Sequence, residues 1–161
     1  MTTKVHLAAD LRCRPVSRFI TAGNRHDSIA FDHVLAGIRI SRIGAGRPRT
    51  RPGHVLADKA YSNRRIRTSL RQRGIAATIP EPADQIAHRA RRGRHGGRPP
   101  SFDLERYKHR NTAERCINKL KHHRAIAARY DKRAYIFQGT VDVASIRIWL
   151  RDPSHDPRDR P

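Results

Sequence analysis

This sequence of 161 residues has few cysteines, few acidic side chains and few aromatic residues. Its two cysteines, Cys13 and Cys116, are too few for a disulfide framework or for a zinc site made of thiolates. The N-terminal segment lacks the apolar stretch of a signal peptide, and no run approaches the roughly 18 apolar residues of a membrane-spanning helix. These absences favour a reduced, cytoplasmic setting and argue against a membrane partner.

Acidic residues are heavily outnumbered by basic ones. The chain has 35 Lys and Arg against 14 Asp and Glu, which gives a net charge of +21. Such an excess predicts a polyanionic partner, and nucleic acid is the first candidate. The hydrophobic fraction of 37% allows one domain with a modest core. The glycine-containing segment GAGRPRTRPG lacks the Lys-Ser/Thr pair of a phosphate-binding loop, so a nucleotide site of that kind is excluded.

The N-terminal residues predict a β-hairpin followed by a helix. Thr3–Ala9 and Pro15–Ala22 are rich in the β-branched and apolar residues that are typical of strands, and Asp10–Arg14 supplies a turn between them. A helix should follow, capped by Asp27 or Ser28.

The next segment predicts a strand, a helix and a second strand. His54–Ala60 contains a short apolar strand with Asp58 towards its C-terminal end. Ser62 or Asn63 can cap the following helix, and Ile75–Ile79 makes the second strand, so the two strands should pair in parallel. Ligands bind at the carboxyl ends of strands in α/β sheets, which makes Asp58 a candidate site residue.

The most informative stretch runs from Tyr107 to Arg124. If it is one α-helix, Tyr107, Arg110, Glu114 and Lys121 lie within an arc of about 60°. The neighbouring apolar face consists of Ala113, Cys116, Ile117 and Leu120. Glu114 would then lie at the edge of burial between positive charges, which suits it to hold a divalent cation or to lie beside phosphate groups. The alternative is a basic surface helix whose Glu114 makes ordinary i, i+4 pairs.

Residues 82–101 form the densest positive tract of the chain and contain repeated Gly and Pro. They predict a flexible basic arm that grips phosphates, although a solvated linker is the alternative. The candidate contacts in this arm are Arg91, Arg92 and Arg94. Further on, Ala134–Leu150 predicts a helix in preference to a strand, and residues 152–161 predict a disordered tail.

The array Tyr107-x2-Arg110-x3-Glu114-x6-Lys121 resembles the signature around the last catalytic glutamate of bacterial insertion-sequence transposases of the DDE type. LADKAYSNRRIRTSLRQRGI resembles the segment that carries the second catalytic aspartate of that family, and TTKVHLAADLRCRPVSRFITAGNRHD resembles its second and third core strands. The resemblance covers about residues 2 to 151. It implies an α/β fold with a ribonuclease H-like mixed sheet flanked by helices, as one partial catalytic domain over residues 1–151.

The resemblance also implies DNA transposition by metal-dependent strand cleavage and strand transfer at insertion-sequence ends. It assigns Asp58 and Glu114 as catalytic metal ligands, with Mg²⁺ or Mn²⁺ as the cofactor. Tyr107, Arg110 and Lys121 match the positions taken to contact DNA phosphates near the cut. The expected DNA-binding set is completed by Lys59, Arg91, Arg92 and Arg94.

One feature of the family pattern is missing. The first catalytic aspartate normally lies on a first core strand, upstream of the TTKVH-like segment, and Asp10 and Asp27 are poorly placed substitutes. We therefore expect a C-terminal portion that lacks the first core strand and is inactive alone, either as a remnant or as half of an enzyme encoded in two overlapping frames. Its expected partners are transposon-end and target DNA near the nucleoid, an upstream-frame half and further copies of itself. The alternative is a non-catalytic basic nucleic-acid-binding protein.

Overall fold

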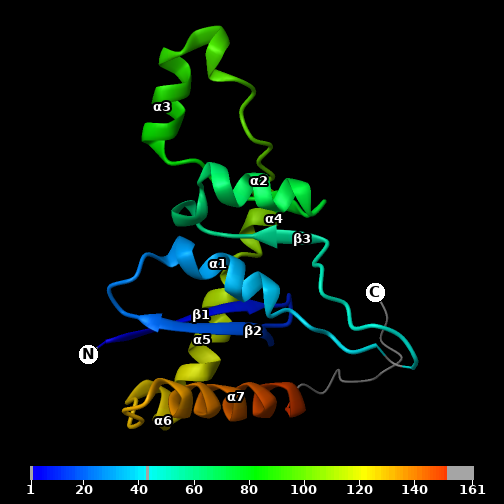
Figure 1. Cartoon of the computed structure of the whole chain (residues 1–161), viewed down its shortest axis with the longest axis vertical. Helices are drawn as coiled ribbons and strands as arrows, with labels where there is room; N and C mark the ends of the chain where they lie inside the picture. The colour runs from blue at the N-terminus through cyan, green and yellow to red at the C-terminus, as the bar shows by residue number, and fades with distance from the viewer. Residues whose placement is uncertain (1, 43, 152–161) are drawn as a thin grey trace. The chain divides into compact units, whose positions relative to one another are not determined.

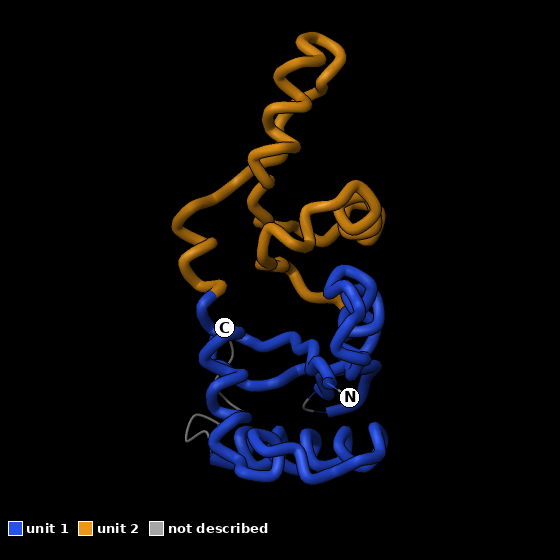
Figure 2. The backbone as a smooth tube through the Cα atoms, turned by 90° about the vertical axis from the view of Figure 1, so that its left-hand side faces the viewer, with its two compact units in different colours: residues 1–50, 111–161 blue, residues 51–110 orange. Residues whose placement is uncertain are grey.

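The computed structural model describes residues 2–42 and 44–151, and the chain divides into two compact units (Figure 2). Unit 1 contains residues 1–50 and 111–161, and unit 2 contains residues 51–110. The partial catalytic domain expected over residues 1–151 spans residues of both units and stays a prediction. The tail predicted to be disordered, residues 152–161, lies outside the described residues.

Unit 1 begins with the predicted hairpin. Strands β1 (Thr3–Ala9) and β2 (Pro15–Ala22) pair antiparallel, over the residues expected from the sequence. Asp10 closes the turn, because its carboxylate accepts hydrogen bonds from the backbone amides of Arg12 at 3.0 Å and Arg14 at 2.9 Å. The Arg14 guanidinium also pairs with this carboxylate, so the turn is fixed by side chains as well as by the strand ladder.

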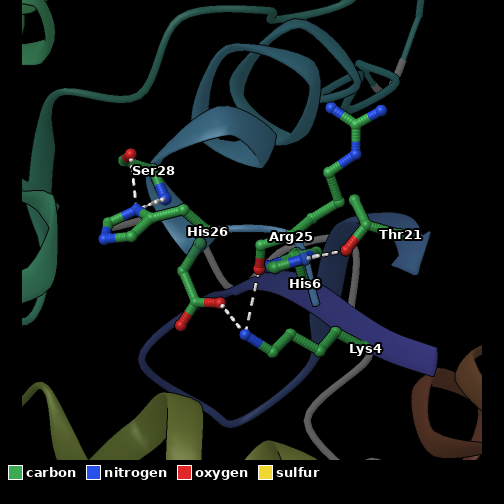
Figure 3. Close-up of polar contacts among 7 residues, drawn as sticks. Lys4, His6, Thr21, Arg25, His26 and Ser28 are labelled. Carbon is green, nitrogen blue, oxygen red and sulfur yellow. Dashed lines mark hydrogen bonds and ion pairs between the residues drawn. The ribbon is translucent and has the colours of Figure 1, made fainter. Parts of the chain in front are cut away.

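Helix α1 (Asp27–Ala36) follows the hairpin, but its cap differs from the prediction. The N-cap residue is His26, whose Nδ1 accepts a hydrogen bond from the backbone amide of Ser28 at 3.3 Å (Figure 3). Asp27 is already the first helical residue, and its carboxylate pairs with the Lys4 ammonium at 2.9 Å. The predicted capping by Asp27 or Ser28 was wrong because the helix begins one residue earlier and a histidine can also accept the amide bond.

Three further helices complete unit 1: α5 (Asn111–Lys121), α6 (Arg124–Ala127) and α7 (Ala134–Leu150). Helix α7 confirms the predicted range and excludes the strand alternative. Figure 1 shows α1 on one side of the hairpin and α7 on the other. The Trp149 indole donates to the Pro15 carbonyl at 2.7 Å, which attaches α7 to β2. The buried side chains of α7 are Phe137, Val141 and Ala144.

Unit 2 contains the predicted strand, helix and strand. Strands β3 (His54–Leu56) and β4 (Ala76–Thr78) are parallel, and η1 (Lys59–Tyr61) and α2 (Arg64–Gln72) connect them. Asn63 caps α2 as expected, since its side chain accepts from the third helical amide at 2.8 Å. The buried apolar side chains of this unit are Ile66, Leu70, Ile75 and Ile79.

The basic tract of unit 2 is partly helical. Residues 82–101, expected to be a flexible arm, contain α3 (Ala83–Arg91) and the short helix η2 (Gly93–Gly96); α4 (Leu104–Lys108) follows. The first half of the tract holds alanine, glutamine and arginine, which favour helix, whereas its glycines and later prolines come after position 92. Helix α3 was not predicted because the glycines and prolines of the second half dominate the composition of the whole tract.

The described strands form two separate two-stranded sheets, β1–β2 in unit 1 and β3–β4 in unit 2. This confirms the α/β class and both local pairings. The single ribonuclease H-like mixed sheet and the absent first strand remain predictions. Among residues 2–42 and 44–151, none of the helices is long and apolar enough to cross a membrane.

Candidate functional site

Asp58 lies two residues beyond β3, and its side chain is exposed. Its Oδ1 accepts a hydrogen bond from the Lys59 amide at 2.6 Å, so Asp58 caps η1. The sequence placed this carboxylate at the C-terminal end of a strand, whereas β3 ends at Leu56 and Asp58 follows two residues later, still beyond the carboxyl end of a strand of the parallel pair. A carboxylate has two oxygens and several lone pairs, so one backbone bond leaves it able to act as a ligand.

A polar network holds the segment that follows Asp58. The buried Ser62 hydroxyl donates to the Gln85 side chain at 3.1 Å, and the Gln85 amide group donates back to the Ser62 carbonyl at 2.6 Å. The Arg67 guanidinium donates to the Ser62 hydroxyl at 2.9 Å and to the Ile79 carbonyl at 2.8 Å. Ser62, one of two predicted helix caps, is therefore a buried junction between α2 and α3, and Arg67 extends the network to Ile79, the residue after β4. Neither Gln85 nor Arg67 was predicted as a site residue, because their pairing with Ser62 depends on the tertiary arrangement.

His54, at the start of β3, connects the parallel strands to α4. Its Nε2 lies 3.0 Å from the Thr78 hydroxyl, and its Nδ1 lies 3.3 Å from the Arg106 guanidinium. A guanidinium can only donate, so Nδ1 must accept and the proton lies on Nε2. Burial and the nearby Arg106 charge lower the pKa of His54, in agreement with a neutral ring.

Glu114 lies in the first turn of α5, where the helix dipole favours a carboxylate. The buried residues of α5 are Thr112, Cys116 and Leu120. At 100° per residue Glu114 lies about 160° from the centre of this buried stripe, and its side chain is exposed. The prediction that Glu114 lies at the edge of burial was therefore wrong. Burial raises the pKa of the Cys116 thiol to about 12, which makes this cysteine an unreactive core residue.

The signature residues do not share one helix. His109 and Arg110 form a turn between α4 and α5, with amides that donate to the carbonyls three residues earlier. The single continuous helix considered for Tyr107 to Arg124 was therefore wrong. Asn111, which begins α5, belongs to the residues that favour helix starts over helix interiors. Within α5, Glu114 and Lys121 still lie on one side, since seven residues make nearly two full turns.

Tyr107 and Arg110 come together within unit 2. The Arg110 guanidinium lies 5.7 Å from the centre of the Tyr107 ring, within the range of a cation–π contact. Phe102 adds a second ring, with its centre 5.2 Å from that of Tyr107. Asp58 belongs to the same unit, whereas Glu114 and Lys121 belong to unit 1. The convergence of Asp58 and Glu114 on one metal ion stays a prediction.

The predicted basic contacts of unit 2 are exposed. Lys59 lies in η1, Arg91 and Arg92 lie at the C-terminal end of α3, and Arg94 lies in η2. A hollow of about 430 Å³ beside α3 and η2 is lined in part by His88, Arg89, Arg91 and Arg92. Arg89 also pairs with Glu81. Gly96 keeps this helical return compact, because a Cβ at that position would approach the Arg89 carbonyl to 2.3 Å.

The two acidic substitutes considered from the sequence are both engaged in local structure. Asp10 closes the hairpin turn, and Asp27 accepts from Lys4, whose ammonium also donates to the Arg25 carbonyl at 3.0 Å (Figure 3). In the part of the chain that the structure describes, no three His, Cys, Asp or Glu side chains gather in a group that could hold a metal ion. Asp58 and Glu114 each offer carboxylate oxygens, the ligands that hard divalent cations prefer.

Comparison with known proteins places these features in a family. Residues 1–138 match the family model described as the transposase DDE domain. The chain is 32% identical over 151 residues to a Brucella ovis protein named as a transposase for insertion sequence element IS6501, which covers 94% of this chain and 100% of that protein. It is 31% identical over 134 residues to a Burkholderia cepacia protein named as a transposase for insertion sequence element IS402, covering 83% of this chain and 56% of that protein. No solved structure matches.

The α/β units, the exposed Asp58 and Glu114 and the basic surface thus occur in a chain that belongs to the DDE transposase family. The match includes residues of both units, and both relatives are named as transposases of insertion sequences, so the chain belongs to the insertion-sequence transposases of this family.

Proposed function

We propose that this chain contributes two acidic residues, Asp58 and Glu114, to a DNA-cleaving and strand-transferring centre. The observation that carries the proposal is the exposed Asp58 carboxylate two residues beyond β3, within the residues that match the transposase family. Glu114 adds a second exposed carboxylate at the start of α5. Acidic residues from separate elements are what metal-assisted phosphoryl transfer requires.

The proposed cofactor is Mg²⁺ or Mn²⁺, because hard divalent cations prefer carboxylate oxygens. Such an ion, when bound, supplies Lewis-acid stabilisation of the charge that develops during phosphoryl transfer. This chain's own contribution is to fix Asp58 through the Lys59 amide and the Ser62 network, and Glu114 through the buried face of α5.

We further propose that another polypeptide segment completes the acidic set. Among the described strands, β1 pairs only with β2, so its other edge can accept a further strand. An upstream-frame half carrying an aspartate on such a strand would fit this edge. The isolated chain is then inactive, and robust Mg²⁺- or Mn²⁺-dependent nicking of insertion-sequence end DNA that Asp58→Asn abolishes would contradict this view.

The DNA contacts are proposed to come from the exposed basic residues and the Tyr107–Arg110 pair. Phosphate contacts release counterions, so the logarithm of affinity should fall with the logarithm of salt by about 0.9 per contact on duplex DNA. Replacing Arg91, Arg92 and Arg94 by glutamine should reduce this slope and weaken binding to all duplex sequences alike. The residues proposed to act nearer the cut are Lys59, Tyr107, Arg110 and Lys121.

Calorimetric titration of the full chain with Mn²⁺ tests the metal assignment. We expect weak binding that Asp58→Asn and Glu114→Gln each reduce by about tenfold or more, which corresponds to at least about 1.4 kcal/mol. Glu105→Gln is the matched control, because it removes an exposed carboxylate that pairs with Lys108 on α4. Absent binding, or binding that neither variant changes, would overturn the metal site and favour a non-catalytic nucleic-acid-binding protein.

A further inference from the structure

Helix α7 carries two apolar faces. Phe137, Val141 and Ala144 are buried in unit 1. A second set remains exposed, with relative exposures of 43% for Ile136, 68% for Val143, 58% for Ile146 and 77% for Leu150. At 100° per residue the centres of the two sets are about 140° apart. A helix that is apolar on nearly opposite faces is normally covered on both.

The exposed set has the spacing of a coiled-coil seam. Ile136, Gly139, Val143, Ile146 and Leu150 follow one another at intervals of three, four, three and four residues. This is the a and d pattern by which two helices pack knobs into holes. The seam consists of these five residues, and it is self-complementary because a second copy presents the same knobs and holes.

Gly139 supports the seam by a separate observation. A Cβ at this position would meet no atom within 4 Å, so packing inside the described chain does not require glycine there. Glycine inside a helix lowers its stability relative to alanine. A glycine at this position would allow the backbone of another helix to approach closely, which gives a reason for its presence.

We propose that this face of α7 is a self-association surface, on which a second copy of the chain packs as a parallel two-stranded coiled coil. Asp142 and Arg147 flank the seam at g and e positions, five residues apart, so each carboxylate faces the arginine of the other copy. Asp142 also pairs with Arg18 in its own chain. Antiparallel packing would bring the two Asp142 side chains together, which disfavours it.

The high positive charge opposes this association and gives it a diagnostic salt dependence. Two copies each carry a net charge of +21 and repel one another until salt screens them. The screening length falls from about 10 Å at 0.1 M salt to about 3 Å at 1 M. Self-association should therefore strengthen as salt rises, whereas the proposed DNA binding should weaken.

Sedimentation equilibrium of the full chain at about 0.1 M and about 1 M salt tests the proposal. We expect a weak dimer at high salt, since two heptads make a short seam. Val143→Glu should raise the dissociation constant at least tenfold without changing the circular dichroism of the monomer. Gln138→Glu is the matched control, with the same charge change on an exposed position of α7 outside the seam. A monomer at all concentrations and both salts, or equal effects of the two variants, would overturn the proposal.

Cross-linking tests the orientation. Leu150→Cys should form a disulfide between two copies at high salt, because equal positions meet in a parallel pair; the native Cys13 and Cys116 are buried. Cross-links between mixed Ile136→Cys and Leu150→Cys chains, without Leu150→Cys homodimers, would overturn the parallel arrangement. The surface assigns a location to the self-association expected from the sequence, and none of its residues is a proposed metal ligand. Failure of the Mn²⁺ test and failure of the dimer test are thus distinguishable.

Discussion

Unit 1 and unit 2 are held together by different kinds of interaction. Unit 1 packs helices on both faces of a hairpin with strands of seven and eight residues. Unit 2 has strands of three residues each and only four buried apolar side chains, supplemented by the hydrogen bonds of Ser62, Arg67 and His54. A two-stranded sheet is marginal without packing. Unit 1 should thus depend chiefly on its apolar core, and unit 2 on its polar network.

The largest effect should come from the core of unit 1. Phe137→Ala removes a ring that is 3% exposed and should lower the free energy of unfolding of unit 1 by about 3 to 5 kcal/mol. Hydrogen exchange resolved by segment measures this in the amides of β1 and β2. Gln138→Ala, at an exposed neighbouring position, should change stability by less than about 0.5 kcal/mol. An equal loss of protection in β3 and β4 would contradict the expectation that the stability of unit 2 does not depend on the core of unit 1.

An intermediate effect should come from the polar network of unit 2. Arg67→Met removes the donors to the Ser62 hydroxyl and the Ile79 carbonyl, and should lower the free energy of unfolding of unit 2 by about 1 to 3 kcal/mol. Arg64→Met is the matched control, because it removes the same charge from an exposed position of α2. If the β4 amides exchange at the same rate in both variants, the network does not stabilise this unit.

Local patterns in the sequence predicted most individual elements. The hairpin, α2, β3, β4 and α7 follow from alternation, helical spacing and capping residues, all of which act over a few positions. The break after α4 was missed because His109 and Arg110 are compatible with a helix interior, and no proline or glycine marks the turn. The missed α3 shows the opposite error, in which glycines at one end dominated the interpretation.

The candidate site was predictable only in part. The local sequence placed Asp58 at the C-terminal end of a strand, and the structure has it two residues beyond the end of β3. The exposure of Glu114 was not predicted, because the helical wheel started from a longer helix with a different buried stripe. The Ser62, Gln85 and Arg67 bonds join residues 5 to 23 positions apart and depend on how α3 packs. Such pairings are decided by tertiary structure, so no single-sequence pattern predicts them.

The smallest effect should be the response of unit 2 to acid. Burial and Arg106 lower the pKa of His54 below its usual 6.5, so the unfolded chain binds more protons than the folded one as the pH falls below that value. The contribution of His54 is therefore present above pH 6.5 and is lost as the pH falls through its folded pKa, when Nδ1 can no longer accept from Arg106. Hydrogen exchange of β3 and β4 amides between about pH 5 and 7, corrected for intrinsic rates, measures this loss.

His54→Gln should reduce the acid sensitivity of unit 2, while His88→Gln, at an exposed position of α3, should leave it unchanged. Unit 1 provides the internal comparison, because burial also lowers the pKa of His6, whose Nε2 lies 2.8 Å from the Thr21 hydroxyl (Figure 3). Acid should therefore still loosen β1 and β2 in the His54→Gln variant. If this variant retains the full acid response of β3 and β4, the neutral His54 ring is not what joins those strands to α4, and the contrast drawn between the two units would rest on Arg67 and Ser62 alone.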